Sequence, residues 1–152
     1  MDLKKIGKHL DVFFRDVTAL GSYGFFFLLL LLILSLEKIQ LFWQVLFGFG
    51  FTLLAVVIIR MFYFKDRPQR QQFSTFIERI DAASFPSLHT ARIVMLTLLL
   101  IDYFQNDLAT LFFTGVAFLV MYSRVHLRKH DWVDIAGGII LGVITFFLAL
   151  MV

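Results

Sequence analysis

The sequence contains no cysteine, no internal repeat and no low-complexity tract, and only 16% of its 152 residues are charged. Without cysteine there is neither a disulfide framework nor a thiol nucleophile. Without an inter-domain linker, one domain over residues 1–152 is expected. The chain is instead rich in apolar residues: 60% are hydrophobic, 20 are phenylalanine, and the mean hydropathy is +0.86. This apolar share exceeds that of soluble domains, so the composition indicates an integral membrane protein.

Five apolar segments follow one another along the chain. Three of them are uncharged runs of about the length that crosses a bilayer, and they cover residues 17–36, 41–59 and 135–152. Two less pure segments lie between them, at residues 87–105 and 108–123. The pattern predicts an all-α fold, an integral membrane bundle of about five transmembrane helices over residues 17–152.

The first 16 residues have a different pattern. Apolar residues recur there at helical spacing, namely Leu3, Ile6, Leu10, Phe13, Phe14 and Val17. Charged residues fill the remaining surface, namely Lys4, Lys5, Lys8, Asp11 and Arg15. This arrangement is typical of an amphipathic helix in the headgroup layer, so an N-terminal interfacial helix is expected over residues 1–16.

Basic residues gather on one face of the predicted bundle. Alternating spans put on that face His89, His130 and a set of Arg and Lys residues: Arg60, Lys65, Arg67, Arg70, Arg79, Arg92, Arg124, Arg128 and Lys129. The opposite face receives Lys38 and the acidic residues Glu37, Asp102 and Asp107. A positive cluster of this kind predicts an anionic ligand, because arginine and the amides of helix N-termini are the usual ligands of phosphate.

The most informative pattern follows the fourth apolar segment: Ser123-Arg124, five residues, His130, three residues, Asp134. Ionisable residues at membrane depth are costly and usually functional. In a helix, His130 and Asp134 would share a face, so the carboxylate could fix the tautomer of the imidazole. An oriented imidazole acts as a nucleophile or a base.

Together with two earlier elements, this pattern resembles the signature of a known family. The earlier elements are Arg60, six residues, Arg67-Pro68, and then Pro86-Ser87-Leu88-His89. The three elements resemble the type 2 phosphatidic acid phosphatase (PAP2) superfamily, which includes lipid phosphatases, undecaprenyl diphosphate phosphatases, lipid A phosphatases and vanadium haloperoxidases. The resemblance covers about residues 60–134. Two positions differ: Arg60 stands where the family usually has lysine, and Leu88 where it usually has glycine.

The resemblance implies a role for each matching residue. His130 would attack phosphorus to form a phosphohistidine, with Asp134 holding its other nitrogen, and His89 would protonate the leaving oxygen. Phosphate oxygens would be held by Arg60, Arg67 and Arg124, with Ser87 and the backbone amides near Leu88. The implied chemistry requires no metal, no cofactor and no nucleic acid.

The implied function is hydrolysis of a phosphomonoester or pyrophosphate on a lipid of a bacterial-type inner or plasma membrane. The candidate lipids are phosphatidic acid, phosphatidylglycerol phosphate, undecaprenyl diphosphate and lipid A. A lipid phosphotransferase using the same histidine and a non-catalytic anion-binding membrane protein are the alternatives. The N-terminal basic residues favour a cytoplasmic site by the positive-inside rule. Family analogy favours the extracytoplasmic face, which is the orientation we expect.

Several charged residues near the motifs have other interpretations. Arg92 either pairs with Asp134 or Glu78, or contacts a second phosphate or sugar of the substrate. His126 precedes His130 by four residues, so His126, His130 and Asp134 form an alternative metal site, which the surrounding positive charge disfavours. Asp131 is expected to pair with Arg128. Headgroup contacts without a substrate role are expected for Lys65, Arg70, Arg79 and Lys129.

Overall fold

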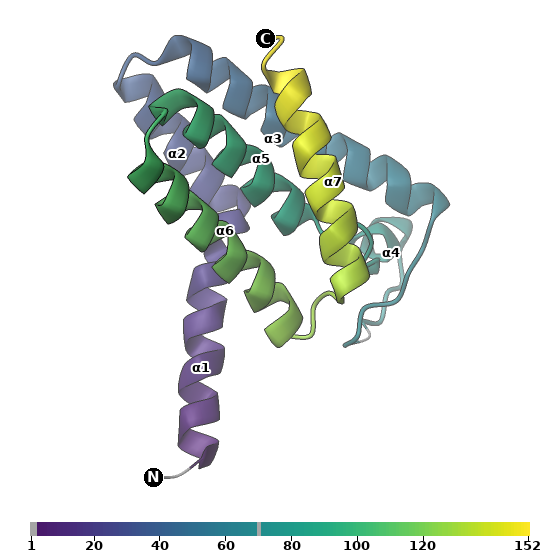
Figure 1. Cartoon of the computed structure of the whole chain (residues 1–152). Helices are drawn as coiled ribbons and strands as arrows, with labels where there is room; N and C mark the ends of the chain where they lie inside the picture. Colours follow the sequence, from purple (N-terminus) through teal and green to yellow (C-terminus); the bar gives the residue numbers. More distant parts are fainter. Residues whose placement is uncertain (1–2, 70) are drawn as a thin grey trace.

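A computed structural model describes residues 3–69 and 71–152, with side chains from residue 7 onward. Arg70 and the side chains of residues 1–6 lie outside this part of the chain. The described residues form helices and no strand, which confirms the predicted all-α class (Figure 1). The elements are α1 (Leu3–Thr18), a 3-10 turn η1 (Ala19–Gly21), α2 (Tyr23–Ser35), α3 (Ile39–Phe62), α4 (Phe76–Ala82), α5 (Leu88–Phe104), α6 (Asp107–His126) and α7 (Trp132–Ala149).

Four predicted spans each coincide with one long helix, namely α3, α5, α6 and α7. Among the described residues, α3, α6 and α7 are long and apolar enough to cross a membrane, and α1 with α2 forms a fourth candidate bent by 51°. The predicted boundary at residue 16 falls inside α1, which continues to Thr18, and α2 starts only at Tyr23. The chain turns there because the Ser22 side chain accepts a hydrogen bond from the Phe25 amide and starts a new helix.

Polar side chains mark the starts of the later helices. The Ser87 side chain caps α5, Asn106 caps α6, and Asp131 caps α7 in a reciprocal capping box with Asp134. The short helix α4 was not predicted, although its capping box of Thr75 and Glu78 follows the known sequence signature. Its seven residues lie within a polar connection and bury little apolar surface, so the sequence shows no apolar periodicity there.

Helix α5 is the centre of the bundle and contacts α3, α6 and α7 (Figure 1). One core cluster joins α5 residues Met95 and Leu99 to Phe26 of α2 and Val45 of α3. Helix α7 comes especially close to α5, because Gly138 and Gly142 face it. A Cβ atom at Gly142 would lie 2.7 Å from the Ala91 carbonyl oxygen. Small residues spaced four apart allow this backbone approach between membrane helices.

The close contact of α5 and α7 gives a stability prediction. In Gly138→Ala the new Cβ would lie 2.7 Å from both the Ser87 carbonyl oxygen and the Thr90 Cβ. Overpacking of this kind costs about 1–3 kcal/mol, so we expect a lower thermal unfolding midpoint of the detergent-solubilised protein. The control is Gly115→Ala in α6, where a Cβ meets nothing within 4 Å. Equal midpoints for the two variants would contradict the close contact.

Candidate active site

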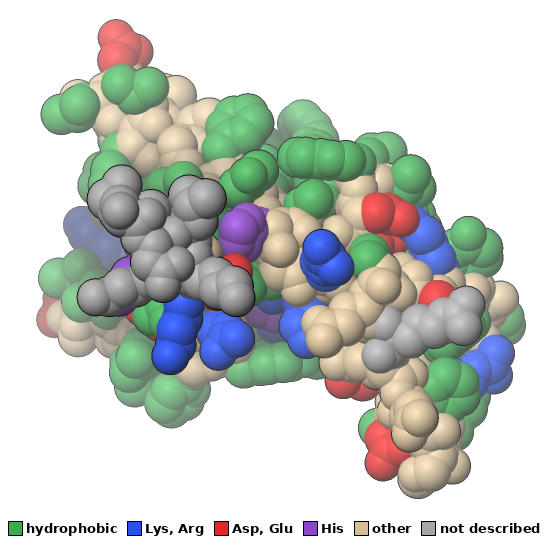
Figure 2. Space-filling model, turned by 90° about the horizontal axis from the view of Figure 1, so that it is seen from below, with side chains coloured by type: hydrophobic (Ala, Val, Ile, Leu, Met, Phe, Trp, Pro, Cys, Tyr) green, Lys and Arg blue, Asp and Glu red, His purple; other side chains and the backbone are tan. Residues whose placement is uncertain are grey.

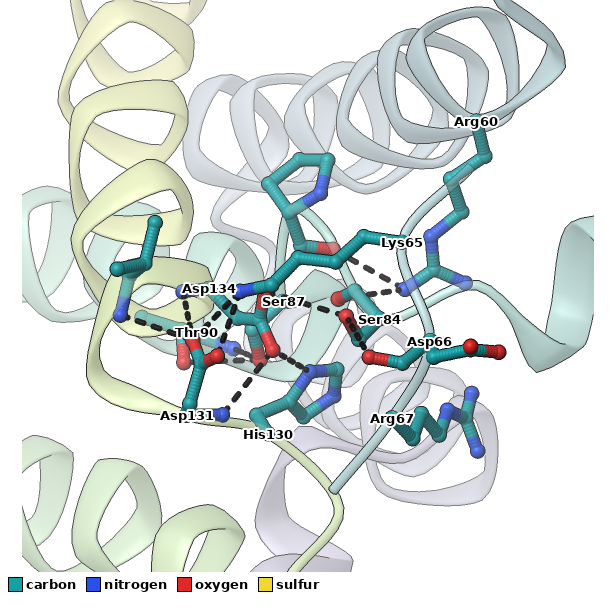
Figure 3. A network of polar contacts seen from close by, with 12 residues as sticks. Arg60, Lys65, Asp66, Arg67, Ser84, Ser87, Thr90, His130, Asp131 and Asp134 are labelled. Carbon is teal, nitrogen blue, oxygen red and sulfur yellow. Dashed lines mark hydrogen bonds and ion pairs between the residues drawn. The ribbon is translucent and has the colours of Figure 1, made fainter. Parts of the chain in front are cut away.

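The three sequence motifs meet at one end of the bundle. The end of α3 and the following loop bring Arg60, Lys65 and Arg67, and the start of α5 brings the second motif. The third motif comes from the end of α6, the loop that follows it and the first turn of α7. Seen from this end, Lys and Arg side chains gather on the surface around histidine (Figure 2). Residues separated by up to about half of the chain therefore share one polar network (Figure 3).

His130 and Asp134 form the predicted pair. Because Asp131 caps α7, Asp134 lies in the first turn of that helix and His130 lies just before it. His130 Nδ1 is 3.4 Å from Asp134 Oδ2, and the two side chains are 2% and 0% exposed. This distance is long for a hydrogen bond, and Nδ1 has no hydrogen-bond partner among the described residues. The contact is thus an electrostatic one that orients the ring, and such contacts often shorten when substrate binds.

Lys65 is the main partner of Asp134, which the sequence interpretation missed. Its Nζ lies 2.8 Å from Asp134 Oδ1 and 2.6 Å from Asp131 Oδ2. Two further donors hold the Asp134 carboxylate: the Ser84 hydroxyl at 3.3 Å and the Asp131 amide at 3.0 Å. The expectation that Lys65 contacts only headgroups is wrong, because a buried carboxylate requires a compensating charge.

Asp131 differs from expectation for the same reason. It was expected to pair with Arg128, but its carboxylate binds Lys65 and accepts hydrogen bonds from the Val133 and Asp134 amides. The helix cap and the ion pair together place Asp131 on the side of the loop that faces Lys65. In the sequence, the contact between Lys65 and Asp131 is indicated only by the position of Lys65, which lies between Arg60 and Arg67 of the first motif.

Electrostatics keep the imidazole of His130 neutral. Burial lowers the pKa of His130 to about 4, and the nearby Arg124 acts in the same direction, whereas Asp134 opposes the change. Burial also opposes the charge on Lys65, but its hydrogen bonds to Asp131 and Asp134 outweigh burial and raise the pKa of Lys65. At neutral pH the site therefore holds an uncharged imidazole beside a charged lysine.

The three arginines predicted to bind phosphate are each anchored through terminal nitrogens (Nη1 or Nη2) of the guanidinium. Arg60 donates to the carbonyl oxygens of Ile80 and Pro86 at 3.3 and 3.0 Å. Arg67 donates to Gln71 and to the Asp81 carbonyl oxygen, and Arg124 donates to the Thr18 hydroxyl. The Nε atoms of Arg60, Arg67 and Arg124 are buried without a hydrogen-bond partner among the described residues. Buried donors in this state are rare, and a bound anion would supply the acceptors that they lack.

The second motif forms the start of α5. The Ser87 hydroxyl caps the helix and accepts hydrogen bonds from the Thr90 amide and hydroxyl, and the Ser87 amide donates to the Asp134 carbonyl oxygen at 3.0 Å. Leu88 begins the helix, and amides in a first turn have no partner within the helix. His89 lies next along the chain and packs against Gly21, a neighbour that no sequence pattern predicted.

Arg92 lies one turn further into α5 and is 0% exposed. Its guanidinium carbon lies 4.2 Å from the ring centres of both Tyr23 and Phe49, an arrangement typical of cation–π contacts. Its nitrogens have no hydrogen-bond partner in the described part of the chain. The structure therefore gives Arg92 neither of its expected acidic partners: Asp134 binds Lys65, and Glu78 closes the cap of α4.

His126 does not join His130. Its Nε2 lies 2.9 Å from Asp11 Oδ1, and its ring packs on Phe14 of α1. The described residues contain no group of three His, Cys, Asp or Glu side chains that could hold a metal ion. The alternative metal site built from His126, His130 and Asp134 is therefore not formed. Among the other basic residues, Arg79 stacks on Phe64, and Arg70 lies outside the described residues.

Comparison with known proteins gives one family and two similar folds. The family model of the PAP2 superfamily matches residues 41–152. The crystal structure of Aquifex aeolicus LpxE is similar, with a TM-score of 0.78 and 23% identity over 94% of this chain and 86% of that one. The crystal structure of a PAP2-type phosphatidylglycerolphosphate phosphatase from Bacillus subtilis has a TM-score of 0.72 and 22% identity over 93% and 75%. At these identities the likeness shows a shared fold.

The contact of Lys65 with Asp134 gives a prediction on histidine titration. Lys65→Met removes the positive charge that partly offsets the negative charge of Asp134. The carboxylate then stabilises a protonated imidazole more strongly, so we expect the pKa of His130 to rise from about 4. An NMR titration of the four labelled histidines measures this change. Lys38→Met removes an exposed charge at the start of α3, the end of that helix opposite to Arg60, and is expected to leave the pKa of His130 unchanged. An unchanged or lower pKa in Lys65→Met would contradict the ion pair.

Proposed function

The chain belongs to the PAP2 superfamily, and on this premise we propose that it hydrolyses a phosphomonoester or pyrophosphate of a membrane lipid through a phosphohistidine on His130. One observation carries the proposal. Three buried Nε donors, on Arg60, Arg67 and Arg124, lack partners at the end of the bundle that also holds the His130–Asp134 pair. A phosphoryl group supplies the negative oxygens that such donors bind.

The first proposed step transfers the phosphoryl group to the protein. His130 Nε2 forms a bond to phosphorus while the bond from phosphorus to the lipid oxygen breaks, and His89 gives its proton to that oxygen. His130 Nδ1 faces Asp134, so the carboxylate stabilises the positive charge that develops on the ring. The arginines repel a protonated His89, and the negative charge of the bound phosphate offsets this repulsion.

The second proposed step reverses the roles at the same atoms. A water oxygen forms a bond to phosphorus, the bond to His130 Nε2 breaks, and His89 accepts a proton from the water. The products are inorganic phosphate and the dephosphorylated lipid. In both steps Arg60, Arg67 and Arg124 neutralise charge on the equatorial oxygens, with Ser87 and the first amides of α5 beside Leu88. The Leu88 side chain, where the family usually has glycine, packs against the core cluster of Val56, Ala91 and Leu141.

The guanidinium groups supply the positive charge that metal ions provide in many other phosphatases, so we propose a metal-independent reaction. Phosphate release by the purified protein is accordingly expected to persist in the presence of a chelator. Loss of release with a chelator, restored by a divalent ion, would contradict this part of the proposal.

The position of the site favours a lipid substrate. The motifs lie at the ends of apolar helices, where a lipid can present its phosphate while its chains remain in the bilayer. We propose an extracytoplasmic site in a bacterial-type inner or plasma membrane, acting on lipid A, undecaprenyl diphosphate, phosphatidylglycerol phosphate or phosphatidic acid. Free phosphate as product distinguishes hydrolysis from transfer, which yields a new phospholipid, and from simple binding, which yields neither.

Removal of the proposed nucleophile gives a second functional prediction. His130→Ala is expected to lose at least about a hundredfold in phosphate release, because the covalent route lowers the barrier by several kcal/mol. Release of phosphate from each candidate lipid measures the loss. His9→Ala is the control, because His9 is an exposed residue of α1. Activity of His130→Ala above about a hundredth of the unmodified protein would remove His130 as nucleophile.

The role of His89 is tested by the leaving group. A general acid accelerates departure of a poor leaving group by about 10²- to 10⁴-fold, but p-nitrophenol departs without a proton. His89→Ala is therefore expected to lose turnover of lipids while retaining measurable turnover of p-nitrophenyl phosphate. His130→Ala is expected to lose both. Equal loss of the two substrates in His89→Ala would leave His89 without a role as acid.

A further inference from the structure

We propose that the segment from Thr18 to Gly21, at the bend between α1 and α2, is a positioning element of the active site. It contacts Arg124 on one side and His89 on the other. Both residues have roles in the proposed function, so this inference rests on that function. The segment precedes residues 41–152, which match the family model, so the family signature does not include it. Its two contact residues, Thr18 and Gly21, are therefore a contribution of this chain beyond the three motifs.

Thr18 orients Arg124 without neutralising it. Arg124 Nη1 donates to the Thr18 hydroxyl oxygen at 2.9 Å, although the two residues are 106 positions apart. Arg124 is 8% exposed, and its Nε has no hydrogen-bond partner among the described residues. A carboxylate at this place would compete with phosphate for the guanidinium. A hydroxyl fixes the plane of the group and leaves its full positive charge for the substrate.

Gly21 determines where the His89 ring lies. A Cβ atom built on Gly21 would lie 2.7 Å from His89 Cδ2, 3.0 Å from its Cβ and 3.1 Å from its Cγ. The backbone of η1 thus closes directly over the ring and its base, and any side chain at this position would displace the imidazole. The requirement for glycine comes from this close approach, since no glycine in the described residues has a positive φ. An acid displaced by about 1 Å loses about a hundredfold in rate.

Both flanks of the segment are fixed to the bundle. On the α1 side, Asp11 Oδ1 is 2.9 Å from His126 Nε2, and the Phe14 ring packs on Tyr122 with centroids 5.4 Å apart. On the α2 side, Ser22 caps the helix and the Tyr23 ring stacks on Arg92 at 4.2 Å. The segment is therefore held at both ends, and its position can be transmitted to the two catalytic side chains that it touches.

The experiment uses two matched pairs of variants in the whole 152-residue chain, with two substrates. The substrates are p-nitrophenyl phosphate and one lipid. The lipid is whichever of lipid A, undecaprenyl diphosphate, phosphatidylglycerol phosphate or phosphatidic acid the unmodified protein turns over fastest. The first pair is Gly21→Ala and Gly24→Ala, because a Cβ at Gly24 meets nothing within 4 Å. The second pair is Thr18→Val, which keeps the shape but removes the hydroxyl, and Thr18→Ser, which keeps the hydroxyl. Thermal unfolding midpoints of all four variants monitor folding.

We expect the two positions to give different patterns. Gly21→Ala should lower kcat/KM for the lipid at least about tenfold more than kcat/KM for p-nitrophenyl phosphate, because only the lipid needs the acid, whereas Gly24→Ala should leave the ratio unchanged. Thr18→Val should lower kcat/KM for both substrates by about tenfold, because both present a phosphate to Arg124, and Thr18→Ser should restore it.

Other outcomes would overturn the proposal. An unchanged ratio in Gly21→Ala, or equal loss in Thr18→Val and Thr18→Ser, would mean that the segment serves stability alone. Absence of phosphate release by the unmodified protein from every lipid would instead overturn the proposed function, and with it this inference. The two failures are distinguishable, because the first is seen only when the unmodified protein is active.

Discussion

The arrangement of the site depends on one buried charge, the carboxylate of Asp134, which is 0% exposed. A buried carboxylate is tolerated only when donors surround it. Here they come from three separate segments: Lys65 after α3, Ser84 before α5, and the Asp131 amide in the loop before α7. Compensation of this charge therefore brings the three motifs together, and the imidazole of His130 is oriented as part of the same network.

The backbone makes this network possible. The Ser87 amide donates to the Asp134 carbonyl oxygen, which requires α5 and α7 to approach closely, and Gly138 and Gly142 permit that approach. The arginine side chains are held in a different way. Arg60 donates to a carbonyl oxygen of the loop before α5, and Arg124 donates to the hydroxyl of Thr18. Neither hydrogen bond neutralises the positive charge of the guanidinium. The positive potential of the site remains available to a phosphorylated substrate.

The sequence predicted the helical membrane bundle, because apolar run length is a local property. It also predicted the pairing of His130 with Asp134, but on the assumption of one helix, whereas His130 lies before the cap of α7. It did not predict the Lys65 contact, since the loop after α3 has no periodicity that places its side chains. The neighbours Thr18 and Gly21 were also missed, because they depend on how α1 and α2 pack on α5 and α6. Asp131 was assigned the wrong partner because a basic residue close in sequence was preferred to one distant in sequence but close in space.

The proposed mechanism transfers the phosphoryl group to His130, and trapping this covalent intermediate tests the mechanism most directly. The protein would be mixed with lipid labelled with ³²P at the scissile phosphate, quenched in base within the first turnover, and digested for mass spectrometry. The mechanism predicts an acid-labile, base-stable phosphoryl group on the peptide that contains His130, absent in His130→Ala. Turnover without label on that peptide, or with label on another residue, would contradict the mechanism.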